Sequence, residues 1–248
     1  TVSLCVQPHL LVSARRKPSK PLFDKKDFLE KTLLSKVHFL VKEVVLNQMK
    51  NEKWEDKKRL FTLALETKNV QLRQTVAALL NSIPASFRTE YETLLDDKSY
   101  QTQEIALYNL WNNFPEQRIA YLEKSKKWMG FNDYNLRTLW LTLALSTPNY
   151  AIDKVALANE LIPYSSINYE ANTRQNALEK LLAFKIINDR VLENLVQATT
   201  HHMWQFTKFG RDNIRKLLKN PEMRVSLERI LPNLNEAEQF QLNRLLKE

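Results

Sequence analysis

The residues most able to do chemistry in this 248-residue chain are four histidines and one cysteine. His201 and His202 are adjacent, and neighbouring residues on a helix point in different directions, so they make a poor chelating pair. The helical zinc motif His-Glu-x-x-His does not occur. Cys5 precedes His9 by four residues but has no further group to orient a nucleophile. The sequence therefore predicts no catalytic, metal-binding or cofactor-binding residue in this chain.

The chain has only two glycines, Gly130 and Gly210, and they are isolated. This excludes a glycine-rich phosphate loop and the Gly-x-Ser-x-Gly turn of a serine hydrolase. It also argues against all-β folds, which need many tight turns. The longest apolar runs are far below the roughly 20 residues that cross a bilayer. We therefore expect a soluble protein. One cysteine does not distinguish the compartments, so both the cytoplasm and the periplasm remain open.

A degenerate sequence formula recurs along the chain and indicates a repeat architecture. "YEANTRQNALEKL" (169–181) shares an aromatic or polar opening, an arginine and a following Ala-Leu pattern with segments at 69–80, 99–110 and 133–144, and 209–218 keeps its second half. The repeated polar position falls at Arg73, Gln103, Arg137, Arg174 and Arg211. The steps of about 30–37 residues are typical of paired helices. We predict an all-α solenoid of about five antiparallel helix pairs.

The formula also suggests what each of its residues does. We expect Tyr100, Tyr134 and Tyr169 to pack over a turn into the neighbouring repeat. Ala106, Trp140 and Ala177 should lie in the buried seam. The repeated arginine or glutamine should donate hydrogen bonds to carbonyls in the turn of the preceding repeat, which is a structural role.

Residues 1–22 differ from the rest of the chain. They alternate β-branched and polar residues and then become basic and proline-rich, so we expect short strands or an extended adapter and linker. From residue 23 to 248 the pattern is helical. A first helix is expected from Asp27 to about Met49, with one apolar face formed by Phe28, Leu29, Leu33, Val37, Leu40, Val41, Val44 and Val45. A second should span about Trp54 to Thr67, capped near Asn51. Six prolines, from Pro84 to Pro232, should separate the helices.

The charge distribution argues against a protein that follows nucleic acid along its length. Residues 1–70 carry 15 basic and 8 acidic side chains, residues 71–170 carry 9 and 11, and residues 171–248 carry 13 and 9. A backbone-binding solenoid would be basic throughout. The acidic pair Asp96 and Asp97 is expected to flank a helix start in solvent. The basic stretch 123–130 is expected to end a helix, with Gly130 as its C-terminal cap.

One local surface stands out as a candidate contact site. Lys208, Arg211, Arg215 and Lys219 recur at three- and four-residue steps and form a basic stripe. Three aromatic residues at 204, 206 and 209 lie beside it. The stripe could hold an acidic segment or a phosphate. The alternative is a solvated helix face whose aromatic neighbours belong to the core.

The order of a β-like lead-in, a helix-pair array and the closing segments "LVQATTHHMWQFTKFGRDNIRKLL" and "LPNLNEAEQFQLNRLLKE" resembles the C-terminal HEAT-like domain of the M1 zinc aminopeptidases. The resemblance covers about Phe23 to Glu248. In that family the zinc and the catalytic motifs lie in preceding domains, so none of those residues can be transferred here. The resemblance implies a non-catalytic domain that encloses the catalytic chamber of a parent enzyme and limits which peptides enter. Because the chain begins at Thr1 without a signal peptide, we expect it to be a piece of a larger protein.

Two other functions remain open from the residues alone. The first is a free-standing HEAT-like scaffold that binds a protein or peptide. The second, less favoured by the charge distribution, is a nucleic-acid-binding helical repeat. An upstream His-Glu-x-x-His in the same reading frame would distinguish the aminopeptidase from both.

Overall fold

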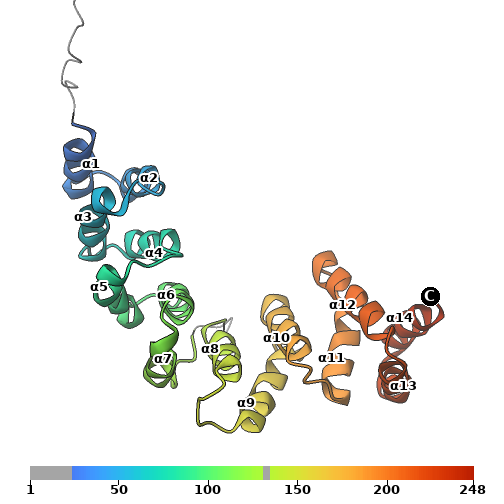
Figure 1. The fold of residues 1–248 in the computed structure, drawn as a ribbon. Coiled ribbons are helices and arrows are strands. Elements are labelled where there is room, and N and C mark those ends of the chain that lie inside the picture. Colours follow the sequence, from blue (N-terminus) through green and yellow to red (C-terminus); the bar gives the residue numbers. More distant parts are fainter. Residues whose placement is uncertain (1–23, 131–134) are drawn as a thin grey trace, which may run out of the picture.

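The fold is a curved stack of helices that follow one another in sequence order. The computed structural model of the chain describes residues 24–130 and 135–248. In this part of the chain there are fourteen α-helices and no strand, arranged as an arc from α1 to α14 (Figure 1). They are α1 (Lys25–Leu34), α2 (Phe39–Gln48), α3 (Trp54–Leu65), α4 (Val70–Leu79), α5 (Arg88–Glu92), α6 (Tyr100–Asn113), α7 (Arg118–Ser125), α8 (Asn135–Ser146), α9 (Lys154–Leu161), α10 (Ala171–Ala183), α11 (Asp189–Ala198), α12 (Trp204–Leu217), α13 (Pro221–Ile230) and α14 (Glu236–Lys247). The β-like lead-in predicted for residues 1–22 lies outside the described residues.

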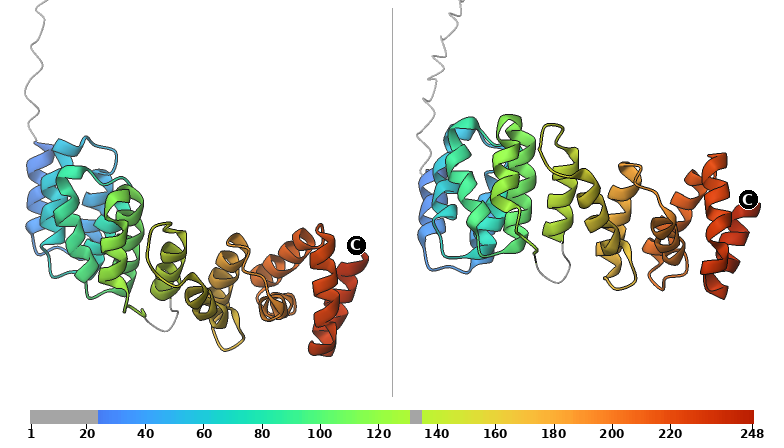
Figure 2. Two further views of the ribbon diagram at one scale, coloured as in Figure 1. Left: turned by 60° about the horizontal axis from the view of Figure 1, so that its bottom comes forward. Right: turned by 90° about the horizontal axis from the view of Figure 1, so that it is seen from below.

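The helices form seven consecutive pairs. In each pair an odd-numbered helix is followed by an even-numbered one, and the even-numbered helices contact one another in order along the stack. Figure 1 places these even-numbered helices on the concave side of the arc, so we call them the inner helices and the odd-numbered ones the outer helices. Figure 2 shows the same elongated stack from two further directions. The described chain therefore has one long concave surface.

The predicted number of about five pairs is too low, for a reason visible in the fold. The sequence formula marks five inner helices, from α4 to α12. Of the terminal inner helices, α2 does not carry it, and α14 keeps only a polar side chain at the repeated position, Gln239, without the arginine that joins the next pair. A terminal helix has only one neighbouring pair, so the residues that join two neighbours are not required there.

The long first helix predicted from Asp27 to Met49 is instead two helices, α1 and α2. Ser35 ends α1 in an extended conformation and its hydroxyl donates to the Thr32 carbonyl at 2.7 Å. His38 begins α2, and its Nδ1 accepts the Leu40 N–H at 3.4 Å. These local side-chain bonds replace the helical ladder between residues 35 and 38. The next helix, α3, matches its prediction within two residues at the C-terminus, but Lys53 rather than Asn51 precedes it.

The break changes which residues are buried. Leu29, Leu33 and Val45 lie in the core as predicted. The other five predicted core residues are exposed: Phe28 by 51%, Val37 by 42%, Leu40 by 53%, Val41 by 47% and Val44 by 57%. Because α1 ends at residue 34 and the chain changes direction before α2, the apolar residues from 28 to 44 cannot all lie on one helix face. The first pair consequently presents aliphatic side chains at its surface.

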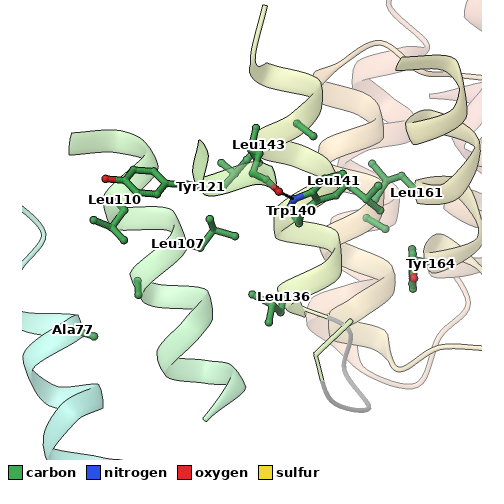
Figure 3. Packing of buried hydrophobic residues seen from close by; sticks show 14 of the residues in the cluster. Ala77, Leu107, Leu110, Tyr121, Leu136, Trp140, Leu141, Leu143, Leu161 and Tyr164 are labelled. Carbon is green, nitrogen blue, oxygen red and sulfur yellow. Dashed lines mark hydrogen bonds between the residues drawn. The ribbon is translucent and has the colours of Figure 1, made fainter. Parts of the chain in front are cut away.

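The core runs continuously between the two rows of helices. Ala106, Trp140 and Ala177 are buried, as the repeated seam predicts. Trp140 fills the space between α7, α8 and α9, and its indole Nε1 donates to the Leu122 carbonyl at 2.9 Å (Figure 3). Leu107 of α6 lies on one side of this ring and Leu161 of α9 on the other. Each pair thus shares its core with both neighbours.

The tyrosines of the formula have different surroundings. Tyr100 is 49% exposed. Tyr169 contacts Tyr164 within its own pair, with ring centroids 5.1 Å apart. Tyr134 lies outside the described residues. The exposure of Tyr100 does not fit the predicted packing into the neighbouring repeat, whereas for Tyr169, which packs against the core, that packing stays a prediction.

The connections between helices agree with the proline pattern but not with the predicted glycine cap. The six prolines that were predicted to separate helices all lie between α-helices or at the first position of one. Helix α7 ends at Ser125, whereas Gly130 comes later, with a positive φ of 82° that favours glycine. In the described part of the chain, no helix is long and apolar enough to cross a membrane.

Candidate binding surface

The repeated polar residues, which we call the row, each hold the turn that precedes the inner helix on which they lie. Each side chain donates a hydrogen bond to a backbone carbonyl near the end of the outer helix of its own pair. The donors Arg73, Gln103, Arg137, Arg174 and Arg211 reach the carbonyls of Thr67 (2.7 Å), Asp97 (2.9 Å), Lys126 (2.7 Å), Ser165 (3.4 Å) and Thr199 (3.4 Å), respectively. The carbonyl contact is the one expected from the sequence. The turn is different, because it joins the two helices of one pair and not two successive repeats.

Two of the arginines also reach the next pair through a carboxylate. Arg73 on α4 forms an ion pair with Asp97, which precedes α6, and its Nη2 lies 3.2 Å from Oδ1. Arg137 on α8 binds Glu160 of α9 with both oxygens, at 2.6 and 2.7 Å. A bidentate guanidinium–carboxylate pair fixes orientation as well as distance. These arginines therefore connect the two helices of one pair to the following pair.

Arg174 makes the same connection with an aromatic ring. Its guanidinium lies 5.0 Å from the centroid of Phe206 on α12, in the next pair. The side chain is buried, and its Nη2 has no hydrogen-bond partner within the protein. Burial lowers the pKa of Arg174, while the negative charge of Glu238 opposes that shift. All five side chains thus donate to carbonyls within the stack, which is consistent with the predicted structural role.

Asp97 is buried, which differs from the expectation from the sequence. We predicted that Asp96 and Asp97 would both flank a helix start in solvent. Asp96 is exposed and pairs with Lys124 at 2.6 Å. Asp97 is buried between pairs, where its carboxylate binds Arg73 and also accepts the Ser99 N–H at 2.9 Å. The sequence did not show that an arginine 24 residues earlier would reach it.

Two members of the row were missed, and one was placed out of register. On α4, α6 and α10 the polar residue is the fourth of the helix. The fourth residue of α12 is Thr207, whose hydroxyl donates to the His201 carbonyl at 2.5 Å, so Arg211 lies one turn too far along. On α14 the fourth residue is Gln239, which donates to the Leu234 carbonyl at 2.8 Å. A search for any side-chain donor at the fourth helical position would have found both.

The basic stripe on α12 is largely paired within the protein. Lys208 binds Asp212 at 2.6 Å. Arg215 binds Glu248 at 2.7 Å, which raises the pKa of Arg215 and lowers that of Glu248. Arg211 turns toward the Thr199 carbonyl. Of the four cations, Lys219 is exposed and is in none of the ion pairs observed among the described residues.

The histidines and the aromatic residues near the stripe have local roles. The rings of His201 and His202 lie 4.2 Å apart, and Nδ1 of His201 accepts the Met203 N–H at 3.1 Å. Within the described residues, no three His, Cys, Asp or Glu side chains come together as a metal-ligand group. Phe206 is buried, whereas Trp204 is 68% exposed and does not belong to the core as the alternative reading had it.

Grooves lie between neighbouring inner helices of the described chain, including one of about 500 Å³ between α6 and α8 that is lined by Tyr100, Gln101, Ile105 and Leu136. A groove of about 320 Å³ between α2 and α4 is lined mainly by polar side chains: Glu43, Asn47, Gln71, Gln74 and Thr75. Thr75 crosses it to donate to Glu43 at 2.9 Å. A smaller groove of about 180 Å³ reaches from α6 to α10 and includes Thr138, Thr142, Asn176 and Lys180. Asn176 donates to Asn135 at 2.9 Å, which joins α10 to α8.

The groove between α10 and α12 is larger and more apolar. It measures about 540 Å³, and its apolar lining consists of Leu182, Ala183, Ile187, Phe209 and Leu217. Asn213, Lys216 and Glu179 form its polar part. An apolar groove with a few polar groups at its edge can take a side chain and hold the adjoining backbone. The concave side therefore offers amide-rich grooves along its length and one apolar groove near its C-terminal end.

Comparisons of this chain with protein-family models, with curated proteins and with solved structures find no match.

Proposed function

We propose that this chain is a non-catalytic helical-repeat domain whose concave side contacts an extended polypeptide. The observation that carries the proposal is the series of grooves between successive inner helices. Their positions along one side of the arc suit a ligand that runs across several pairs. Curved helical repeats characteristically use such extended concave surfaces for binding.

The chemistry of the grooves favours a peptide backbone. Asn and Gln side chains carry both a donor and an acceptor, so one amide can bind the N–H and C=O groups of an extended chain. Gln71, Gln74 and Asn47 line the first groove, and Asn213 lies at the edge of the apolar one. The apolar groove supplies space for a hydrophobic side chain. Together these features suit an extended peptide with at least one apolar residue.

A nucleic-acid ligand is less well supported. The arginines of the row are directed into the stack, and two cations of the basic stripe are paired with Asp212 and Glu248. The grooves also contain carboxylates, at Glu43, Glu104 and Glu179. A surface that follows phosphates needs a continuous row of free cations.

The resemblance to the C-terminal domain of M1 zinc aminopeptidases specifies the proposal further. In that setting the concave side would face a catalytic domain of the same enzyme and restrict the peptides that reach its zinc. A free-standing scaffold that binds another protein would use the same surface. Both readings require contact with polypeptide on the inner helices.

The test is to fill the grooves and measure peptide binding. Ala78 and Ala183 are exposed helical residues that line the first and last grooves. Ala78→Arg and Ala183→Arg should block the grooves without disturbing the helices, because arginine is a good helix former. Ala237→Arg, at an exposed position on α14, is the matched control.

The probe is a fluorescent mixture of random-sequence twelve-residue peptides, followed by anisotropy. We expect weak binding by the parent chain and by Ala237→Arg, and at least a several-fold loss with either groove variant. A fluorescent single-stranded oligonucleotide is titrated in parallel at two salt concentrations. Binding of the oligonucleotide but not the peptides, unaffected by the groove variants, would overturn the proposal.

A further inference from the structure

The apolar groove between α10 and α12 carries two charged side chains of opposite sign, one on each helix. Glu179 lies on α10 and Lys216 on α12, and both are exposed. Among the described residues, Lys216 is in none of the ion pairs observed, and Glu179 accepts only the hydrogen bond from the Gln175 amide, at 2.9 Å. Both charges are therefore available to a ligand that lies in the groove.

The two charges face the groove from opposite sides and at different heights. Helices α10 and α12 pack against each other in the stack (Figure 1). Glu179 is the ninth residue of α10, whereas Lys216 is the thirteenth of α12, about one helical turn further along. Packed helices lie about 8–10 Å apart and one turn rises about 5.4 Å, so the two backbone positions are roughly 10–12 Å apart.

This separation matches a short stretch of extended peptide. In an extended chain, alternate side chains point to the same face. The first and fifth residues of such a stretch lie about 13 Å apart. The first, third and fifth side chains can therefore reach one charge, the apolar lining and the other charge.

We infer that this groove binds an extended segment in which an apolar residue lies between a basic and an acidic residue, each two positions away from it. The basic side chain pairs with Glu179, the apolar one packs against Leu182 and Phe209, and the acidic one pairs with Lys216. The inference rests on the proposed function, because it specifies which polypeptide the concave side takes at this groove. The order of the charges in the ligand matters, since the two charges of the groove cancel in sum.

A ligand of one charge sign fits the groove less well. An acidic segment, or one that carries phosphate, would be repelled by Glu179, and a basic segment would be repelled by Lys216. Like charges brought together at an interface lower affinity and suppress the wrong partner. A segment with one charge of each sign meets an opposite charge at both places.

The test compares two fluorescent twelve-residue peptides of identical composition. Both have a central Leu in a neutral background, with Lys two positions before it and Asp two positions after it in one peptide, and the reverse in the other. The variant Glu179→Lys with Lys216→Glu exchanges the charges of the groove and keeps good helix formers at both positions. Glu228→Lys with Lys247→Glu is the matched control, because it exchanges two exposed charges outside the groove.

Binding is followed by anisotropy at low salt. We expect the parent chain and the control to prefer one order by about threefold to tenfold, as two exposed ion pairs allow. The exchanged variant should prefer the other order by a similar factor. Replacing the central Leu by Ser should weaken binding of the preferred peptide several-fold, and added salt should reduce the preference.

The outcomes separate this inference from the proposed function. Equal binding of the two orders by the parent chain, or a preference that the exchanged variant keeps, would overturn the inference alone. So would binding of the random-sequence mixture but of neither designed peptide. If neither the mixture nor the designed peptides bind, the proposed function and the inference are both wrong.

Discussion

Replacing Arg137 tests whether the repeated arginine is structural. Arg137 is 9% exposed and makes three hydrogen bonds, two to Glu160 and one to the Lys126 carbonyl, all between 2.6 and 2.7 Å. Its guanidinium also lies 4.5 Å from the centroid of Trp140. In Arg137→Ala the carboxylate and the carbonyl lose their charged donor, and each such bond contributes about 1.5–3 kcal/mol.

The loss of stability in Arg137→Ala is reduced because water can hydrate the Glu160 carboxylate. Removing one partner of a fully buried pair costs about 3–5 kcal/mol, but the Glu160 side chain is 37% exposed and can be hydrated. We therefore expect Arg137→Ala to lower the free energy of unfolding by about 2–3 kcal/mol, by combining the two ranges. For a chain of this size this corresponds to roughly 4–12 °C in Tm. Arg215→Ala is the control, because its ion pair is exposed and should contribute no more than about 1 kcal/mol.

The assay is urea unfolding followed by circular dichroism for Arg137→Ala, Glu160→Ala and the double variant. A double-mutant cycle isolates the interaction between the two side chains, and we expect a coupling of about 1.5–3 kcal/mol. If Arg137→Ala unfolds like the parent chain while peptide binding is lost, the arginine contacts the ligand and the structural account is wrong.

Three further predictions concern α6, α11 and α12. Gly210→Ala should lower the free energy of unfolding by about 1–2 kcal/mol in urea titrations, because its Cβ would lie 3.0 Å from the backbone nitrogen of Thr199; no loss would mean that α11 and α12 can separate. Asn109→Ala should cost about 2–3 kcal/mol in the same assay, because the buried amide donates to the Ala77 carbonyl at 3.1 Å and to the Tyr91 hydroxyl at 2.9 Å; the exposed Asn112→Ala should cost less than about 0.5 kcal/mol. Burial, then the charges of His202 and Arg174, hold the pKa of His201 below its ordinary 6.5, so its contribution is complete above pH 6.5 and is lost as the pH falls below that value. His201→Gln should therefore flatten the decrease in urea midpoint between pH 7 and pH 5, and an unchanged decrease would contradict this.

The sequence predicted the fold class well because local patterns determine it. The spacing of the formula, the scarcity of glycine and the position of the prolines all depend on single helices and their turns. The carbonyl contacts of Arg73 and Arg137 could be anticipated for the same reason, since a donor near a helix start meets the turn before it. The helix break at Ser35 to His38 was missed because an apolar period continued through it while local hydrogen bonds ended the helix.

The partners of the row could not be predicted, because they depend on how pairs stack. Asp97 and Glu160 follow their arginines by 24 and 23 residues, but many other acids in the chain have no such role. The spacing of 23 or 24 residues between an arginine and its acidic partner identifies a pair only once the Arg73–Asp97 and Arg137–Glu160 pairs are known. At Gln103 the corresponding positions are Lys126 and Lys127, so an arginine there would have met cations.

That exception at Gln103 has a consequence for how the array comes apart. In a linear stack, each pair is stabilised only by its immediate neighbours. Arg73 and Arg137 provide a charged connection on either side, but Gln103 binds only the Asp97 carbonyl of its own pair among the described residues. The boundary between α6 and α8 therefore has no buried ion pair of this kind among the described residues. The Lys124–Asp96 pair that crosses it is exposed and contributes little, so we expect this junction to open before the other two. Amide protons near this boundary should exchange with solvent through partial opening, at a lower free energy than those in the interior of either half.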